Sequence, residues 1–549
     1  MPLALPLEKF YQWEKETPYK TFLKQPYQGH LKSLMWSDVS RQVRSIASFL
    51  MLQDFPSGSN IAIYSKNSAY WIMADLAIWL SGHISVPLFP NLDGPSTKSL
   101  LEHSETQLIF LEKGKNWESL KDHIPKKIPK IFLPPHKEKM DLLWEKICTE
   151  YDPFTQNVLR KGDEVATIIY TSGTTGSPKG VMHTFSSFAT GAQNILDIVE
   201  LKGEQHFFSY LPLAHVAERV LIEVGSLYVN ATITFLENKS TFAKDLKKAR
   251  PTVFLAVPYI WESIQKKVLQ KISQNKLNIL LNIPFLKSYI KRKIRKRIGL
   301  KRTQFFLSGA ASIKEDLLHW FKEIDISIIE CYGMTENLTY SHGNLESPQF
   351  FGTVGKPYPD VEVKFSEDGE ILIKSPCNLK GYYKDPERTL NELQGSFFKT
   401  GDIGQQDSQG HLTITGRKKD IFKTTKGLYI SPKSIEKLFY PSPIIQHICV
   451  IGDSLPSSMA LITLDQEDPQ FSKEETIKLL LAQKEKVNEQ LLEHERVTKI
   501  IILKDAWDEN NGMLTPTLKV RRNVIEERFK KYYQKWHDLE EEVIWEEEA

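Results

Sequence analysis

The stretch Tyr170-Thr-Ser-Gly-Thr-Thr-Gly-Ser-Pro-Lys-Gly180 combines three glycines, several hydroxyl side chains and one lysine directly after the apolar run 165–170. This combination predicts a buried strand that ends in a loop whose backbone N–H groups and hydroxyls surround phosphate oxygens. A flexible linker would also be rich in Gly, Ser and Thr, but linkers rarely follow a β-rich apolar strand. The loop is not a kinase-type P-loop, because neither Ser nor Thr follows Lys179.

Length, charge and cysteine content limit the classes of protein that fit this chain. A chain of 549 residues is too long for one compact core and should form at least two domains. The net charge of +3 excludes a nucleic-acid binder that acts through its overall charge. Four widely separated cysteines exclude a paired-cysteine metal site and predict a reduced, cytoplasmic protein. The first nine residues lack the pattern of a signal peptide, and no apolar run reaches the roughly 18 residues of a membrane-spanning helix.

Between about residues 60 and 330, short β-rich runs alternate with helical patterns. The expected strands are 61–64, 107–111, 165–170, 206–210, 232–236, 252–257, 303–307 and 327–330, and the expected helices include 185–199, 215–229 and 312–321. This alternation predicts parallel sheets covered by helices on both faces. The apolar run 71–87 contains Asp75 and His83 and is expected to be a core helix that leads into a strand.

The pattern changes toward the end of the chain. Short strands with turn signals between residues 361 and 415 predict a small, mostly β subdomain, and further helices and strands follow. The predicted fold class is α/β, with a large N-terminal domain of helix-covered parallel sheets and a small β subdomain (residues 1–416). A small, mobile α+β C-terminal domain is expected to follow (residues 417–549), and its acidic end, 539–549, is expected to be a solvated tail.

Four further motifs carry side chains that suit nucleotide chemistry. Cys331-Tyr-Gly-Met-Thr-Glu336 follows an expected strand and offers a ring for a purine, a hydroxyl for a phosphate and a carboxylate for Mg²⁺. Lys399-Thr-Gly-Asp402 places a carboxylate where it could accept hydrogen bonds from both ribose hydroxyls. Ser308-Gly-Ala-Ala311 ends a strand with small residues, and Gly416-Arg-Lys-Lys-Asp420 supplies cations at the expected domain junction. Each motif alone would more often be a structural turn.

The order of these motifs resembles the adenylate-forming superfamily, which includes acyl-CoA synthetases, luciferases and peptide-synthetase adenylation domains. The matching stretches are 171–180, 211–215, 309–311, 332–336, 400–402 and 416–420, and the segment 381–389 also resembles a family segment. Residues 511–522 are similar to the family's terminal lysine motif. Leu514-Thr-Pro-Thr-Leu-Lys519 and Leu211-Pro-Leu-Ala-His-Val-Ala-Glu-Arg219 resemble long-chain acyl-CoA synthetases more than peptide-synthetase domains.

The resemblance implies ATP, Mg²⁺ and the co-substrate CoA, and it implies roles for single residues. Lys519 would act in adenylate formation, Lys419 would be the pivot of the domain rotation, and Glu336 with Thr171 would hold Mg²⁺. His215 would line the acyl site, although a histidine that only begins a helix is the alternative. The residues implied in nucleotide binding are Thr171, Ser172, Gly173, Thr174, Thr175, Gly176, Lys179, Gly309, Ala310, Ala311, Glu330, Tyr332, Gly333, Thr335, Asp402, Ile414, Arg417 and Lys423. After the rotation, Lys423, Lys426 and Gly427 would line the rebuilt site.

By this resemblance the chain is expected to be an ATP-dependent long-chain fatty acid:CoA ligase that forms an acyl-adenylate first. An enzyme that passes the adenylate to an acyl carrier protein is the alternative. A nucleotide-binding but inactive interaction protein would need eroded motifs, and Lys519, Glu336 and Asp402 are all present. Some long-chain enzymes of the family place a Trp gate where this chain has Arg219, so the presence of that gate is not expected here.

The strongest charge cluster is the segment from Lys287 to Arg302, in which nine of sixteen residues are Lys or Arg. Ile290, Ile294 and Ile298 recur at helical spacing on one face of it. A surface helix that packs through these isoleucines is one interpretation. Docking on an anionic membrane, in which fatty acids dissolve, is the other.

Overall fold

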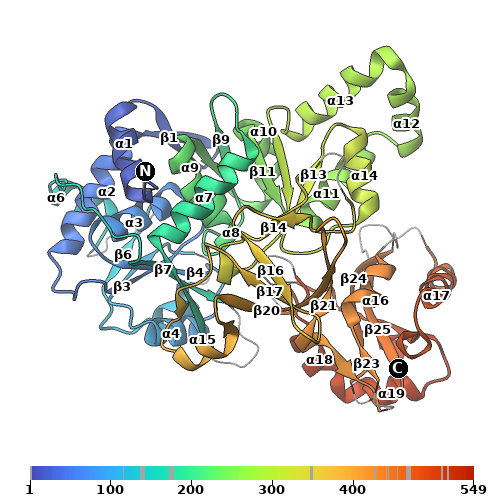
Figure 1. Ribbon diagram of the computed structural model, residues 1–549. Coiled ribbons are helices and arrows are strands. Elements are labelled where there is room, and N and C mark those ends of the chain that lie inside the picture. The colour runs from blue at the N-terminus through green and yellow to red at the C-terminus, as the bar shows by residue number, and fades with distance from the viewer. Residues whose placement is uncertain are drawn as a thin grey trace.

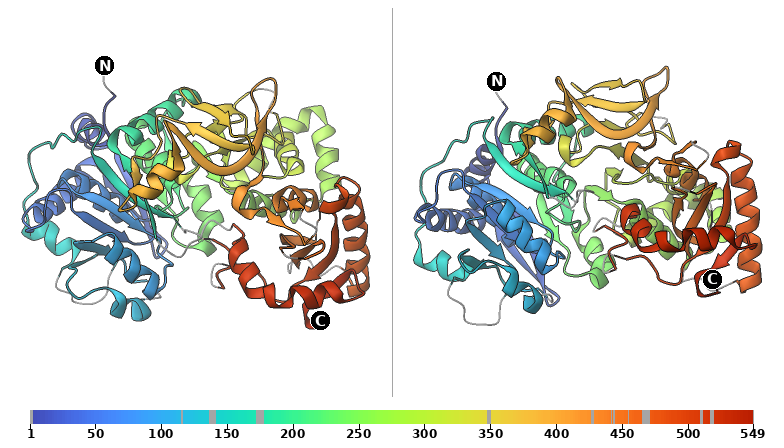
Figure 2. Two further views of the ribbon diagram at one scale, coloured as in Figure 1. Left: turned by 60° about the horizontal axis from the view of Figure 1, so that its bottom comes forward. Right: turned by 90° about the horizontal axis from the view of Figure 1, so that it is seen from below.

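The computed structural model describes residues 3–114, 117–135, 142–171, 178–346, 350–425, 428–440, 442, 444–453, 455–464, 471–508, 511–515 and 519–548. They form a large N-terminal part, a small β subdomain packed on it and a C-terminal part at one end (Figures 1 and 2). The predicted nucleotide-binding residues Ser172, Gly173, Thr174, Thr175 and Gly176, and the expected site residues Lys426 and Gly427, lie outside the described residues.

The strand that leads into the phosphate loop is β7 (Val165–Thr171), and its sheet has the strand order β18-β8-β7-β4-β3-β5-β6. The other members are β3 (Asn60–Tyr64), β4 (Ile84–Leu88), β5 (Leu108–Leu111), β6 (Lys130–Phe132), β8 (Lys179–Thr184) and β18 (Gly381–Tyr382). Strands β3 to β7 run parallel, whereas β8 and β18 are antiparallel to their neighbours. The sheet is therefore mixed at this edge, because the chain returns directly from β7 to β8 without a crossover helix.

Two further sheets complete the core of the N-terminal part, and both have parallel strands with antiparallel additions. One has the order β2-β1-β10-β9, with β1 (Thr21–Tyr27), β2 (His30–Met35), β9 (His206–Ser209) and β10 (Thr232–Phe235). The other has the order β11-β12-β13-β14-β15, with β11 (Val253–Ala256), β12 (Phe305–Ser308), β13 (Ile328–Tyr332), β14 (His342–Gly343) and β15 (Lys356–Pro357). Each of the eight strands expected between residues 60 and 330 is present, displaced at its ends by no more than two residues.

Helices cover these sheets (Figure 1). They are α1 (Pro6–Glu16), α2 (Trp36–Met51), α3 (Ala69–Leu80), α4 (Gly94–His103), α5 (Trp117–Leu120), α6 (Trp144–Glu150), α7 (Phe185–Val199), α8 (Val216–Glu218), α9 (Gly225–Val229), α10 (Phe242–Ala249), α11 (Pro258–Leu269), α12 (Gln274–Asn282), α13 (Pro284–Ile298), α14 (Glu315–Glu323) and α15 (Pro386–Glu392). Every residue of α3 is buried, which confirms the prediction of a core helix that leads into β4. Helix α3 begins at Ser68, whose hydroxyl accepts the N–H of Trp71 at 3.1 Å.

The β subdomain and the C-terminal part follow. The subdomain pairs β16 (Glu362–Phe365), β17 (Glu370–Lys374), β19 (Leu393–Gln394), β20 (Phe397–Gln406) and β21 (Leu412–Arg417) antiparallel. The C-terminal part contains the hairpin of β22 (Phe422–Lys423) and β23 (Tyr429–Ile430), and a sheet of β24 (Ile445–Ile451), β25 (Ser458–Leu464), β26 (Val497–Ile502) and β27 (Val543–Trp545). Its helices are α16 (Pro432–Phe439), α17 (Lys473–Asn488), α18 (Arg522–Phe529) and α19 (Tyr533–Asp538). A division after residue 416 remains a prediction.

The expectation of a solvated tail at residues 539–549 is wrong for its centre. Strand β27 pairs with β26 in parallel, and the side chains of Val543 and Ile544 are buried. The short apolar run Val543–Trp545 completes the sheet edge because Val543 and Trp545 pack on one face of the sheet and Ile544 packs on the other. Among the described helices, none is both long and apolar enough to span a bilayer.

Arg219, where a Trp gate could have stood, is buried in the core of the N-terminal part. It forms an ion pair with Asp75 of α3, a second one with Glu223 at 3.1 Å, and donates to the hydroxyl of Thr167 at 2.6 Å. Its guanidinium also lies over the ring of Trp71, 5.4 Å from the ring centre. Arg219 begins a π-helical turn, Arg219–Val224, inside the expected helix 215–229. The side chain therefore ties that turn to α3 and to β7, the strand of the phosphate loop.

Replacing Arg219 by Met should destabilise the fold strongly, because two carboxylates would then be buried without a counter-charge. We expect a loss of about 3–5 kcal/mol in the free energy of unfolding at neutral pH, measured by urea denaturation. Burial and Asp75 already raise the pKa of Glu223, and without Arg219 the folded-state pKa of Glu223 would rise further above its unfolded value. The loss should therefore be smaller at pH 5 than at pH 8, since protonation favours the folded variant.

The matched control is Arg528→Met, because Arg528 is paired with Asp505 at 2.9 Å on the surface. That change should cost no more than about 1 kcal/mol. Equal losses in the two variants would contradict a structural role for the buried cluster.

Candidate active site

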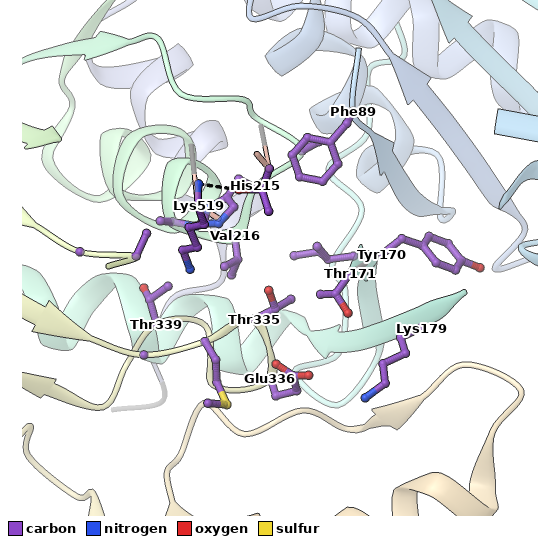
Figure 3. Close-up of a pocket in the computed structure, with 18 of the residues that line it drawn as sticks. Phe89, Tyr170, Thr171, Lys179, His215, Val216, Thr335, Glu336, Thr339 and Lys519 are labelled. Carbon is purple, nitrogen blue, oxygen red and sulfur yellow. Dashed lines mark hydrogen bonds between the residues drawn. The ribbon is translucent and has the colours of Figure 1, made fainter. Parts of the chain in front are cut away.

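A cavity of about 1650 Å³ lies where the N-terminal part, the β subdomain and the C-terminal part meet. The predicted residues that line it are Thr171, Lys179, His215, Gly309, Ala310, Tyr332, Gly333, Thr335, Glu336, Arg417, Lys419 and Lys519. They come from the ends of β7, β12 and β13, from the start of β8, from the N-cap of α8, from the β21 junction and from the loop before α18. In Figure 3, Lys519 and His215 lie on one side of the cavity, and Thr171, Lys179 and Glu336 lie on the other. Segments as far apart as residues 171 and 519 thus converge on one space.

Five predicted nucleotide-binding residues stand outside the cavity wall: Ala311, Glu330, Asp402, Ile414 and Lys423. Glu330 lies beneath the wall, where burial raises its pKa to about 7 and its carboxylate accepts the N–H of Ile313 at 3.4 Å. Asp402 is almost fully buried behind Tyr332 and Arg417, both of which line the cavity. Glu330 and Asp402 therefore lie behind other side chains of the site, whereas Ala311 and Lys423 are exposed outside the cavity.

Lys519 extends into the cavity from the loop that precedes α18 (Figure 3). Its backbone N–H donates to the hydroxyl of Thr515 at 3.0 Å, which fixes the base of the side chain. Burial and, to a smaller extent, the nearby cations Arg417 and Lys433 together lower the pKa of Lys519 to about 8, although Asp402 acts in the opposite direction. An ammonium in such a place is short of counter-charge, so an anion in the cavity would be held strongly.

His215 begins a helix, as the alternative interpretation expected, and it also lines the cavity; its place in an acyl site remains a prediction. It is the N-cap of α8, and its ring Nδ1 accepts the N–H of Ala217 at 3.3 Å. Burial lowers the pKa of His215 to about 4, with a further contribution from the charge of Lys519. The imidazole is therefore neutral at physiological pH, and its role here is to shape the wall beside Lys519.

Glu336 lies on the opposite wall, in the short 3₁₀ turn that follows β13. Tyr382 donates its hydroxyl to Glu336 Oε1 at 3.2 Å, and burial raises the pKa of the Glu336 carboxyl while the charge of Lys179 lowers it. A buried carboxylate with this deficit of positive charge fits a divalent cation, which would favour its ionised form. The hydroxyl-bearing Thr171 lines the same cavity and could supply a second oxygen ligand.

Gly333, between Tyr332 and Glu336, has no room for a side chain. A Cβ built at this position would lie 2.5 Å from the backbone of Thr339, so any larger residue would push the two segments apart. The glycine therefore lets the chain turn directly from the end of β13 into the loop that carries Glu336.

Glu392, which the motif analysis did not single out, contacts the lysine of the phosphate loop. Lys179 forms an ion pair with Glu392 of α15 at 3.1 Å and lies over the ring of Tyr382, 5.4 Å from its centre. Tyr382 also donates to Glu392, so one hydroxyl stands between Glu392 and Glu336. Tyr382 lies in the segment 381–389, whose resemblance to the family was the sequence feature that could have pointed to it. Glu392 follows that segment, and no sequence feature pointed to it.

Glu218 is a second residue to which the sequence analysis gave no role, although it lies within the Leu211–Arg219 motif. It accepts the hydroxyl of Ser209 at 2.7 Å and the N–H of Tyr210 at 3.0 Å. Burial raises its pKa to about 8. Its hydrogen bonds join the end of β9 to α8 and thereby position His215.

One arm of the cavity is apolar. Its wall includes Ile195, Ile198 and Val199 of α7, Leu221 of the π-helical turn, and Leu255 and Leu307 at the ends of β11 and β12. His215 and Val216 line the same cavity and lie beside Lys519 (Figure 3). The cavity therefore offers an apolar tail a place next to the polar groups that suit an anionic nucleotide.

Comparison with known proteins agrees with this arrangement. The family model described as AMP-binding enzyme matches residues 10–383, and the model of the AMP-binding enzyme C-terminal domain matches residues 419–539. A long-chain-fatty-acid–CoA ligase from Mycobacterium bovis is 28% identical, over 94% of each chain. Long chain acyl-CoA synthetase 6, peroxisomal, from Arabidopsis thaliana is 28% identical, over 91% of this chain and 81% of its own.

Solved structures share the fold at lower identity. An anthranilate CoA ligase in complex with anthranoyl-AMP superimposes with a TM-score of 0.80 at 19% identity, covering 97% of this chain and 99% of its own. The adenylation domain of a carboxylate reductase from Mycobacterium chelonae also gives 0.80, at 20% identity, covering 98% of this chain and 92% of its own. Because the first family model spans more than half of its length, the chain belongs to the AMP-binding enzyme family.

Proposed function

We propose that this protein is an ATP-dependent long-chain fatty acid:CoA ligase that forms an acyl-adenylate and then an acyl-CoA, with AMP and pyrophosphate as the other products. The observation that carries the proposal is the apolar arm of the cavity, because its side chains line the same space as Lys519 and Glu336. The relatives named as long-chain acyl-CoA ligases support it, because they match nearly the whole chain.

The first step joins two anions, so it needs cations more than it needs a base. A carboxylate oxygen attacks the α-phosphorus of ATP, and the bond to pyrophosphate breaks. Lys519 would neutralise the carboxylate and the α-phosphate as they approach, and Lys179 would bind the outgoing phosphates once Glu392 releases it. Glu336 and Thr171 would hold Mg²⁺, which supplies positive charge to the phosphate oxygens.

The second step needs a different arrangement around the adenylate. The thiol of CoA attacks the acyl carbon and AMP leaves, so Lys519 no longer has a partner in the reaction. We propose that the C-terminal domain rotates about Lys419, which lies in a 3₁₀ turn directly after β21 and lines the cavity. Lys423 would then move toward the site. Transfer to an acyl carrier protein remains the alternative second step.

The proposal also concerns where in the cell the protein acts. Four separated cysteines, which form no disulfide in the structure, suit a cytoplasmic enzyme. We further propose a peripheral contact with anionic membrane through the basic segment from Lys287 to Arg302.

The function is tested by measuring pyrophosphate release with acids of four to twenty carbons and then adding CoA to the purified protein. We expect release with long-chain acids, because they fill the apolar arm, and conversion of the adenylate to a thioester with CoA alone. Thioester formation only with a carrier protein would support the alternative. No pyrophosphate release with any acid would contradict both.

Lys519→Ala should reduce adenylate formation about 100- to 1,000-fold, because one preorganised cation is removed from the transition state. Thioester formation from a supplied acyl-adenylate should be nearly unchanged. In the parent enzyme, kcat/KM for adenylate formation should fall as pH rises through about 8, the pKa of Lys519 before the nucleotide binds. Lys519→Arg keeps the charge and should abolish that fall, whatever its absolute rate. Equal losses in both half-reactions would contradict the assignment.

Glu336→Gln and Asp402→Asn should be distinguished by their dependence on metal. Loss of the Glu336 charge should raise the Mg²⁺ concentration needed for half-maximal adenylate formation, because a ligand is removed. Loss of the Asp402 charge should raise the KM for ATP at every Mg²⁺ concentration, because its partners Tyr332 and Arg417 line the cavity. Glu387→Gln, an exposed position on α15, is the control. A parent-like Mg²⁺ response in Glu336→Gln would remove its role as a ligand.

A further inference from the structure

Helices α12 and α13 project together from the N-terminal part, away from the cavity (Figure 1). Their bases are anchored: Leu277 and Ile294 are buried in the core beside α14, and Ile290 and Ile298 pack against the same core. Lys291 forms an ion pair with Asp325 at 2.7 Å, and Arg295 donates to the carbonyl of Thr303 at 2.8 Å. The isoleucine face of α13 therefore packs on the core, as expected for a surface helix, and the opposite face of α13 is exposed to solvent.

The far end of this hairpin is apolar and exposed. All residues from 282 to 289 are exposed, and the large apolar side chains of the tip have exposed fractions of 64% (Ile279), 38% (Ile283), 96% (Phe285), 39% (Leu286) and 52% (Tyr289). Five large apolar side chains within eleven residues form a patch, which soluble surfaces usually avoid unless the patch binds something. We define these five residues as the tip.

The charge around the tip has one sign. Residues 271–302 contain eleven Lys or Arg and neither Asp nor Glu. Phe285, Tyr289, Arg292 and Lys296 follow one another at spacings of four, three and four, so they form one stripe on α13, opposite the buried Ile294. The stripe runs from aromatic rings at the end to cations behind them.

We propose that the α12–α13 hairpin docks on an anionic lipid bilayer, with the tip inserted among the acyl chains and the stripe cations on the headgroups. The order of rings and then cations matches the order of hydrocarbon and then phosphate that a bilayer presents. A second copy of this chain would bring the same eleven cations against each other, so charge disfavours it as the occupant. The inference deepens the proposed membrane contact: the sequence pointed to charge alone, whereas the structure adds insertion.

The test is co-sedimentation of the full-length protein with vesicles of phosphatidylcholine, with and without phosphatidylglycerol. The tip variant is Phe285→Ser with Leu286→Ser, and the charge variant is Arg292→Gln with Lys296→Gln, which spares the anchoring Lys291 and Arg295. The parent should bind vesicles that contain phosphatidylglycerol, and each variant should bind them at least about tenfold more weakly. High salt should weaken the parent and tip variant, because it screens the cations.

The controls are Leu52→Ser with Leu159→Ser, which removes exposed apolar side chains elsewhere, and Lys126→Gln with Lys127→Gln, which removes exposed cations elsewhere. Both should sediment like the parent, and all variants should keep parental activity on a soluble medium-chain acid. Parental sedimentation of the tip variant would overturn insertion, and parental binding to neutral vesicles would overturn the role of charge. If the parent protein is a dimer in solution and the tip variant is a monomer, the tip binds a second copy of this chain and the bilayer proposal is overturned. Activity on the soluble acid tests the proposed reaction separately.

Discussion

The ion pair between Asp402 and Arg417 is the contact on which the arrangement of the site depends. Asp402 accepts from Arg417 Nε at 2.8 Å through one oxygen and from the hydroxyl of Tyr332 at 2.8 Å through the other. One buried carboxylate thus joins the end of β13, strand β20 and Arg417, the last residue of β21, which lies two positions before the proposed pivot Lys419. Arg417 in turn helps to depress the pKa of Lys519, so the pair connects the N-terminal wall with the lysine of the C-terminal part.

The buried Arg219 cluster serves the opposite wall in a similar way. It fixes the π-helical turn that carries Leu221 of the apolar arm, and it bonds Thr167 of β7, four residues before Thr171. Glu218, one residue earlier, holds the other side of the same segment against the end of β9. The π-helical turn that carries Leu221 and strand β7 are therefore held in place by the adjacent residues Glu218 and Arg219. A substitution in this buried cluster should therefore alter both the stability of the fold and the geometry of both parts of the cavity.

Local patterns predicted most of the framework and much of the site. Helix α7 has the predicted bounds, and β7 extends one residue beyond its prediction, because periodicity and apolar runs are local properties. The antiparallel return of β8 and the pairing of β27 were not predicted, since both depend on which edge lies free in the folded sheet. Glu392 was missed because its contact with Lys179 spans 213 positions of sequence. The exposure of Phe285 likewise depends on where the tip of the α12–α13 hairpin lies in the folded protein, and the spacing of apolar residues in the sequence does not predict that position.

The pKa values of Lys519 and Glu336 are shifted in opposite directions, and one ligand, ATP with its Mg²⁺, would offset both shifts. The pKa of Lys519 is lowered and that of Glu336 is raised, because burial removes water from both and neither has a full counter-charge. Bound triphosphate would favour the protonated lysine, and Mg²⁺ would favour the ionised glutamate. Binding should therefore take up protons at one wall and release them at the other. On the proposed function, each charge would be available to the nucleotide because the fold leaves it without a full counter-charge, and the deficit at Lys519 would return when the nucleotide leaves.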